Sequence, residues 1–151
     1  MTKKILRVYV DSSVVGGALN KRIANETTSF WDNVRKGEIV VIISDVLEDE
    51  VANAPQRAQD FIDALSESQI ERVISTDESD ALAEKYITEG VVSRESFDDC
   101  AHVALATIAH ADVIVSWNLK HMVRRSEEYK KVNAKLGYPQ IDIKTPDKEL
   151  L

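Results

Sequence analysis

The chain has 151 residues, of which 44% are hydrophobic and 30% charged, as expected of a soluble globular protein with one compact core. Its single cysteine, Cys100, excludes an internal disulfide and indicates a reducing cytoplasm, with Cys100 a small core residue. No apolar stretch approaches a membrane span, and the first apolar run is too short for a signal peptide. The net charge of −7 argues against a passive nucleic-acid binder. We therefore expect one cytoplasmic domain over residues 1–151 and no membrane partner.

The apolar pattern predicts strands that alternate with helices. Runs rich in β-branched residues predict buried strands at 4–11, 38–44 and 112–116. A shorter strand is expected at 71–76, between the second and the last of these. Amphipathic or apolar segments predict helices at 26–37, 44–54, 55–68, 77–90 and 93–111. Residues 137–146 predict a turn and a short edge strand. Strands separated by helices indicate an α/β sandwich with a mostly parallel sheet.

The stretch "SDVLEDEVANA", residues 44–54, contains four acidic residues that differ in their expected surroundings. With Ser44 as the N-cap, a helical projection places Asp45, Glu48 and Asp49 on one solvated side. Glu50 falls among the apolar side chains of the opposite side. A carboxylate there needs a cation, a proton or a hydrogen-bonding partner. The alternative is a frayed helix end that lets Glu50 reach solvent.

Two polar residues follow predicted strands directly. Asp11 ends the first strand, and Asn118 comes just after "DVIVS". In parallel sheets, ligands gather beyond the carboxyl ends of the strands, so both positions are candidate site residues. Asp11 also has a structural alternative, because with Ser12 and Ser13 it could cap the following helix.

The apolar helix at 93–111 contributes a third acid. The segment beginning at Ser96 matches a capping box, in which Asp99 would only cap the helix. The next residues, "CAHVALA", are small and apolar, so the helix enters the core at once and carries the Asp99 carboxylate with it. We expect His102, three residues further on, to be a hydrogen-bonded core residue rather than a ligand.

Oxygen ligands without a companion cysteine pair favour Mg²⁺ or Mn²⁺ over zinc. A carboxylate cluster that holds such a cation can activate water and stabilise the charge that develops on a phosphodiester. Downstream, residues 120–135 carry six basic side chains against two acidic ones, a local charge of +4. This segment is either a solvated helix face or a contact for an RNA backbone.

The stretches "VYVDSSVV", "ISDVLEDEV", "SFDDCAHVALA" and "VIVSWNLKHM" resemble the PIN-domain ribonucleases, particularly the VapC-like toxins of toxin–antitoxin pairs. The tail "GYPQIDIKTPDKEL" is similar to one PIN subgroup. The resemblance covers nearly the whole chain. It implies a Rossmann-like three-layer α/β/α sandwich and metal-dependent cleavage of RNA.

Position by position, the resemblance assigns the first three family acids to Asp11, Glu50 and Asp99, the last in preference to Asp98. These three would be the metal ligands, with Glu50 binding the metal or positioning the attacking water. The fourth acid falls at Asn118, where the chain departs from the common pattern. An amide oxygen can bind a metal or its water but brings no charge, so a second cation would be held less tightly.

The resemblance also indicates supporting positions. Ser12 and Ser116 match small hydroxyl positions that orient metal-bound water or serve only the structure. Lys120, Arg124 and Arg125 follow Asn118 outward and are the expected RNA contacts.

The leading hypothesis is therefore an Mg²⁺- or Mn²⁺-dependent endoribonuclease acting as a toxin. The alternative, left open by Asn118, is a PIN-like module with weak or no catalysis that acts by binding RNA or a protein. A small-molecule phosphohydrolase fits poorly, because no D-x-D, P-loop or G-x-G-x-x-G motif occurs. Expected partners are RNA, a cognate antitoxin and a second copy of the chain, the last through Phe30 and Trp31 if these aromatics lie on the surface.

Overall fold

The computed structural model describes residues 4–19 and 24–147. Its five strands form one sheet in the order β3-β2-β1-β4-β5, and every neighbouring pair is parallel. The strands are β1 Leu6–Val10, β2 Ile39–Ser44, β3 Ile70–Val73, β4 Val113–Val115 and β5 Ile143–Lys144. Each strand lies inside or within one residue of a segment that the sequence predicts. The mostly parallel sheet is thereby confirmed.

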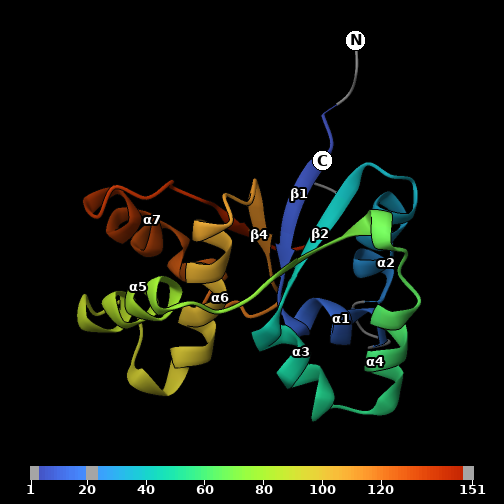
Figure 1. The fold of residues 1–151 in the computed structure, drawn as a ribbon, viewed down its shortest axis with the longest axis horizontal. Helices are drawn as coiled ribbons and strands as arrows, with labels where there is room; N and C mark the ends of the chain where they lie inside the picture. The colour runs from blue at the N-terminus through green and yellow to red at the C-terminus, as the bar shows by residue number, and fades with distance from the viewer. Residues whose placement is uncertain (1–3, 20–23, 148–151) are drawn as a thin grey trace.

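Helices cover both faces of this sheet (Figure 1). On one side lie α1 Ser12–Leu19, α2 Ala24–Arg35, α3 Asp45–Ala52 and α4 Gln56–Asp63. On the other side lie α5 Asp77–Thr88, α6 Phe97–Ile108 and α7 Ser126–Lys135. Single 3₁₀ turns complete the described elements: η1 Glu67–Gln69, η2 Arg94–Ser96 and η3 Val123–Arg125. In the described part of the chain no helix exceeds 12 residues, and none is long and apolar enough to cross a bilayer.

The two helical layers exist because alternate residues of the central strands point to opposite faces. Val8 and Val10 of β1 pack in the core formed with α1 to α4, whereas Tyr9 packs in the core formed with α5 to α7. Both faces of β1 and β2 are buried, which explains why these strands read as continuous apolar runs. The arrangement is the predicted three-layer α/β/α sandwich.

Several boundaries differ from the sequence predictions. The helix predicted at 55–68 ends at Asp63, and the one predicted at 93–111 begins at Phe97 after a 3₁₀ turn. Gly37 and Gly90 follow α2 and α5 with a φ of 80°, a left-handed conformation that glycine adopts readily at helix ends.

The surface aromatics expected to support a dimer are not on the surface. Phe30 and Trp31 have exposed fractions of only 2% and 1% and pack in the core beside β1 and β2. Trp31 makes edge-to-face contacts with Phe30 and Phe61. The commoner alternative for such aromatics, a place in the core, therefore holds, because the apolar face of α2 is buried against the sheet. The homodimer itself stays a prediction without these residues.

Replacing Asn133 with alanine should lower the free energy of unfolding by about 2–3 kcal/mol. Buried Asn133 accepts a hydrogen bond from Tyr86 Oη at 2.5 Å and donates to Thr107 Oγ1 at 3.1 Å and the Pro139 carbonyl at 3.0 Å. Its loss leaves buried polar atoms without a partner. Chemical denaturation measures the difference, and the matched control is Asn53→Ala at an exposed position. Equal stability of the two variants would contradict the prediction.

Candidate functional site

Asp11 lies at the carboxyl end of β1 with an exposed fraction of 4%. Its Oδ1 accepts hydrogen bonds from the backbone N–H of Ser13 at 3.1 Å and from Ser13 Oγ at 2.5 Å. Its Oδ2 accepts one from Ser116 Oγ at 2.5 Å. Asp11 therefore does cap α1, as the structural alternative held, but capping uses only one of its oxygens. The second oxygen is fixed by a residue from the end of β4.

The loop after β4 is tied to the same carboxylate. Ser13 Oγ accepts from the N–H of Trp117 at 2.8 Å, and Ser116 Oγ accepts from the N–H of Asn118 at 2.9 Å. The two hydroxyls are thus oriented by the backbone and turn their own hydrogens toward Asp11. Ser116 thus lies beside a site acid, where the resemblance implies a small hydroxyl, and the hydroxyl of the first helix that contacts Asp11 belongs to Ser13.

Asp99 lies in the first turn of α6, half-buried near Asp11. Burial raises the pKa of the Asp99 carboxyl, and the negative charge of Asp11 adds to that rise. The neighbouring imidazoles of His102 and His121 and a hydrogen bond from Asn118 act in the opposite direction on this pKa. Asn118 Oδ1 accepts from the N–H of His121 at 3.1 Å, so its NH₂ group is the part that faces Asp99. In this arrangement Asn118 directs its donor group toward Asp99, and its Oδ1 already accepts one hydrogen bond.

The capping alternative for Asp99 does not hold. Ser96 precedes α6, but its side chain makes no capping hydrogen bond, and its φ and ψ of −99° and 26° are not those of the extended caps before α3 and α5. The 3₁₀ turn that leads into α6 replaces the predicted capping box. Asp99 therefore has no role at this helix end beyond its favourable place in the first turn.

Glu50 follows the expectation that it differs from its acidic neighbours. Its Oε1 lies 2.5 Å from Nε2 of His102, whose side chain is 2% exposed, whereas the Glu50 side chain is 34% exposed. Ser12 Oγ donates to Glu50 Oε2 at 3.3 Å. His102 is the buried, hydrogen-bonded residue that the sequence predicts, and it supplies the partner that Glu50 needs. Ser12 thus supports Glu50 rather than Asp11.

The other three acids of α3 were expected to be solvated, and for one this is wrong. Glu48 and Asp49 are exposed, but Asp45 is partly buried. Asp45 Oδ1 accepts from the N–H and Oγ of Ser75, both at 3.0 Å. It therefore ties α3 to the segment after β3.

The donor set fits a hard divalent cation in chemistry and charge, although the ligands are not assembled into a closed group. Among residues 4–19 and 24–147, no three His, Cys, Asp or Glu side chains form a cluster that could hold a metal ion. In that same part of the chain Asp11 and Asp99 have no Lys or Arg partner. A buried and a half-buried carboxylate that repel each other and lack a Lys or Arg partner are what Mg²⁺ or Mn²⁺ would neutralise.

Comparison with solved structures identifies the fold. The chain superposes on a chain of the VapBC2 complex from Rickettsia felis, solved with a DNA fragment from its promoter, with a TM-score of 0.59 and 13% identity over 93% of this chain and 98% of that one. It superposes on VapC20 from Mycobacterium tuberculosis, a toxin that cleaves the sarcin–ricin loop, with a TM-score of 0.59 and 13% identity over 89% and 98% of the two chains. The chain has a VapC-like fold. No protein-family model and no curated protein matches it by sequence.

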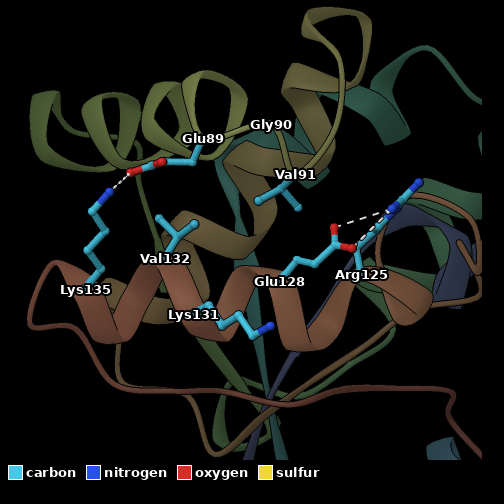
Figure 2. Close-up of a pocket in the computed structure, with 8 residues that line it drawn as sticks. All are labelled: Glu89, Gly90, Val91, Arg125, Glu128, Lys131, Val132 and Lys135. Atoms are coloured by element: carbon cyan, nitrogen blue, oxygen red, sulfur yellow. Dashed lines mark hydrogen bonds and ion pairs between the residues drawn. The ribbon is translucent and has the colours of Figure 1, made fainter.

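In this VapC-like fold, the basic segment 120–135 is only partly available to an anion. Lys130 pairs with Glu127 at 3.4 Å and with Asp142 at 2.8 Å. Lys135 of α7 pairs with Glu89, at the end of α5, beside a cavity of about 340 Å³ (Figure 2). Arg125 pairs with Glu128 three residues further along the chain, on the α7 side of the same cavity. Of the predicted RNA contacts, Lys120 and Arg124 are exposed and have no ion-pair partner among the described residues. Arg125 is the weaker candidate because Glu128 already engages it.

A second cavity adjoins Glu50. It has a volume of about 490 Å³ and is lined by Ser12, Val15, Gly16, Glu50, Val51, Ala54, Pro55, Arg57 and Ala58. Its walls come from α1, α3 and the start of α4. Arg57 is the one cation in this lining and is exposed. Sequence patterns do not single out Arg57, because the spacing of α3 and α4 along the chain does not show that these helices enclose a cavity beside Glu50.

Asp99→Asn should stabilise the metal-free protein at neutral pH. Because the pKa of Asp99 is raised from 3.8 on folding, the folded state binds its proton more tightly than the unfolded state. The stability from this group is present at low pH and is lost as pH rises through the folded pKa. An amide avoids that loss.

Thermal unfolding with a chelator, from about pH 4 to about pH 8, tests this expectation. The Tm of the variant should exceed that of the native chain increasingly as pH rises. Asp98→Asn, at an exposed neighbouring position, is the control and should show no such divergence. A constant Tm difference across the whole range would contradict the assignment.

Proposed function

We propose that the protein is a metal-dependent endoribonuclease whose centre is formed by Asp11, Glu50 and Asp99, with Asn118 in support. The observation that carries the proposal is the burial of Asp11 and the half-burial of Asp99 without a Lys or Arg partner in the described chain, beyond the carboxyl ends of parallel strands. The VapC-like fold supports it, since one structural neighbour is an RNA-cleaving toxin.

Each residue has a distinct task in this proposal. Asp11 and Asp99 hold the cation, and Ser13 and Ser116 keep the Asp11 carboxylate in one orientation through their two hydrogen bonds. A bound divalent ion would supply Lewis acidity and neutralise charge that develops on the phosphodiester. Glu50 binds the metal or holds the attacking water, with its Oε2 toward Ser12. Mg²⁺ and Mn²⁺ both suit this oxygen donor set.

Asp11→Asn and Asp99→Asn should each lower the rate of RNA cleavage by about 10²-fold or more, because each removes a charge that balances the cation. Single-turnover cleavage of a structured RNA with Mg²⁺, with Mn²⁺ and with chelator measures the effect. Asp98→Asn is the matched control and should retain the native rate. Cleavage that survives both chelator and the two substitutions would remove the metal-site proposal.

The RNA backbone should contact Lys120 and Arg124, which have no ion-pair partner in the described chain, and Arg57 at the mouth of the cavity beside Glu50. Replacing Lys120 and Arg124 together by alanine should reduce the slope of log affinity against log salt by about 0.7 per lost contact on single-stranded RNA. Fluorescence anisotropy over a salt series measures this slope.

Lys130→Ala is the control for this measurement, because Lys130 is already paired with Glu127 and Asp142. Its slope should equal that of the native chain. An unchanged slope in the double variant would place the RNA on another face.

One observation favours the alternative function, a module that binds RNA or a protein without cleavage. Glu50 is occupied by His102, and the acids do not form a finished metal site in the described chain. Calorimetry separates the two functions: absence of Mn²⁺ binding together with retained RNA or partner binding would favour the module.

We extend the proposal to a toxin role with a cognate antitoxin, because one structural neighbour is a VapBC complex. A toxin of this kind would arrest growth when expressed alone, and co-expression of the antitoxin would relieve the arrest. Self-association into a homodimer also remains part of the proposal, to be tested by light scattering at micromolar concentration.

A further inference from the structure

The environment of His102 is more specific than packing requires. Its exposed fraction is 1%, and it lies on α6 one turn after Asp99. Both ring nitrogens have an oxygen partner: Nε2 lies 2.5 Å from Glu50 Oε1, and Nδ1 lies 2.6 Å from Tyr9 Oη. A buried ring held at two ends cannot rotate without breaking both hydrogen bonds, so the position of Glu50 Oε1 is fixed from the core.

Tyr9 joins the His102 ring to a second element of the core. Its hydroxyl donates to Ser44 Oγ at 2.7 Å, and its oxygen lies 2.6 Å from Nδ1 of His102. Ser44 Oγ also accepts from the N–H of Leu47 at 3.1 Å, which makes it the N-cap of α3, the helix that carries Glu50.

The two oxygens of Glu50 lie in different surroundings. Oε1 lies 2.5 Å from Nε2 of the buried His102 ring and is fixed from the core. Oε2 accepts from Ser12 Oγ at 3.3 Å, and both Ser12 and Glu50 line the cavity of about 490 Å³. One oxygen is therefore engaged inside the protein, and the other lies beside the cavity.

We propose that His102, held by Tyr9, is a positioning residue that occupies Glu50 Oε1 and withholds it from the metal. This inference rests on the proposed nuclease function. It assigns the cation to Asp11 and Asp99, and leaves Glu50 Oε2, beside Ser12, to hold water or substrate. Glu50 is then a catalytic residue that is not a metal ligand.

The test compares Mn²⁺ affinity with cleavage rate in four full-length variants. Isothermal titration calorimetry with Mn²⁺ alone gives the affinity and stoichiometry, and single-turnover cleavage of a structured RNA gives the rate. Glu50→Gln should leave the Mn²⁺ affinity within about twofold of the native value and slow cleavage about 10²-fold, whereas Asp99→Asn should weaken Mn²⁺ binding at least about tenfold. Equal weakening of Mn²⁺ binding by Glu50→Gln and Asp99→Asn would overturn the inference.

His102→Leu tests the withheld oxygen directly. The freed Glu50 adds a carboxylate to the site, so Mn²⁺ should bind about threefold to tenfold more tightly while cleavage slows about tenfold to a hundredfold. Simple structural damage would weaken binding and slow cleavage together. His102→Gln keeps a side-chain N–H donor for Glu50 and should recover most of the cleavage rate. Weaker or unchanged Mn²⁺ binding in a folded His102→Leu variant would overturn the inference.

Two safeguards keep the outcomes distinct. If His102→Leu does not fold, as thermal unfolding would show, Glu50→Gln and His102→Gln decide the question, because neither removes a buried group without a polar replacement. If the native chain itself neither binds Mn²⁺ nor cleaves RNA, the proposed function fails. If it does both, only the variants can contradict the role of His102.

Discussion

The burial of carboxylates without a Lys or Arg partner is the constraint that shapes the carboxyl edge of this sheet. Asp11 is almost fully buried, yet in the described chain its hydrogen-bond donors are two hydroxyls and one backbone N–H. Such donors orient a carboxylate but do not cancel its charge. Asp99 lies near enough for the negative charge of Asp11 to add to the rise that burial causes in the pKa of Asp99. The edge therefore carries carboxylate charge that its own hydrogen-bond donors do not offset, which is the charge that the proposed divalent cation would neutralise.

A chain of hydrogen bonds through the core sets the geometry of that edge. Tyr9 precedes Asp11 by two residues on β1, Ser44 caps the helix of Glu50, and His102 follows Asp99 by three residues on α6. The three elements that deliver the acids are thus joined to one another by side chains that are not acids. A displacement of α6 relative to β1 would break a buried hydrogen bond and cost about 1–3 kcal/mol. The site is held by the core rather than by its surface loops.

Much of the fold and part of the candidate site could be predicted from local sequence patterns. The rest of the site depended on contacts between residues that are far apart in the sequence. The strand positions followed from apolar runs, and the distinct surroundings of Glu50 followed from its place on a helical wheel, because both signals are periodic and local. The partner of Glu50 could not be deduced, since nothing in the sequence shows that His102 lies opposite it. The choice of Ser13 over Ser12 depends on the first turn of α1, where adjacent residues point in directions about 100° apart. The basic segment was overestimated because Glu89 and Asp142, far away in sequence, neutralise Lys135 and Lys130.

The departure at Asn118 and the pairing of Glu50 with His102 both reduce the number of carboxylate oxygens open to a cation at this edge of the sheet. A carboxylate at position 118 would face Asp99 and add a further negative charge, whereas the amide NH₂ donates to Asp99 and its oxygen accepts from the N–H of His121. His102 occupies Oε1 of Glu50 at 2.5 Å. Asp11 and Asp99 have no Lys or Arg partner in the described chain. The proposed cation would therefore find its counter-charge in these two carboxylates.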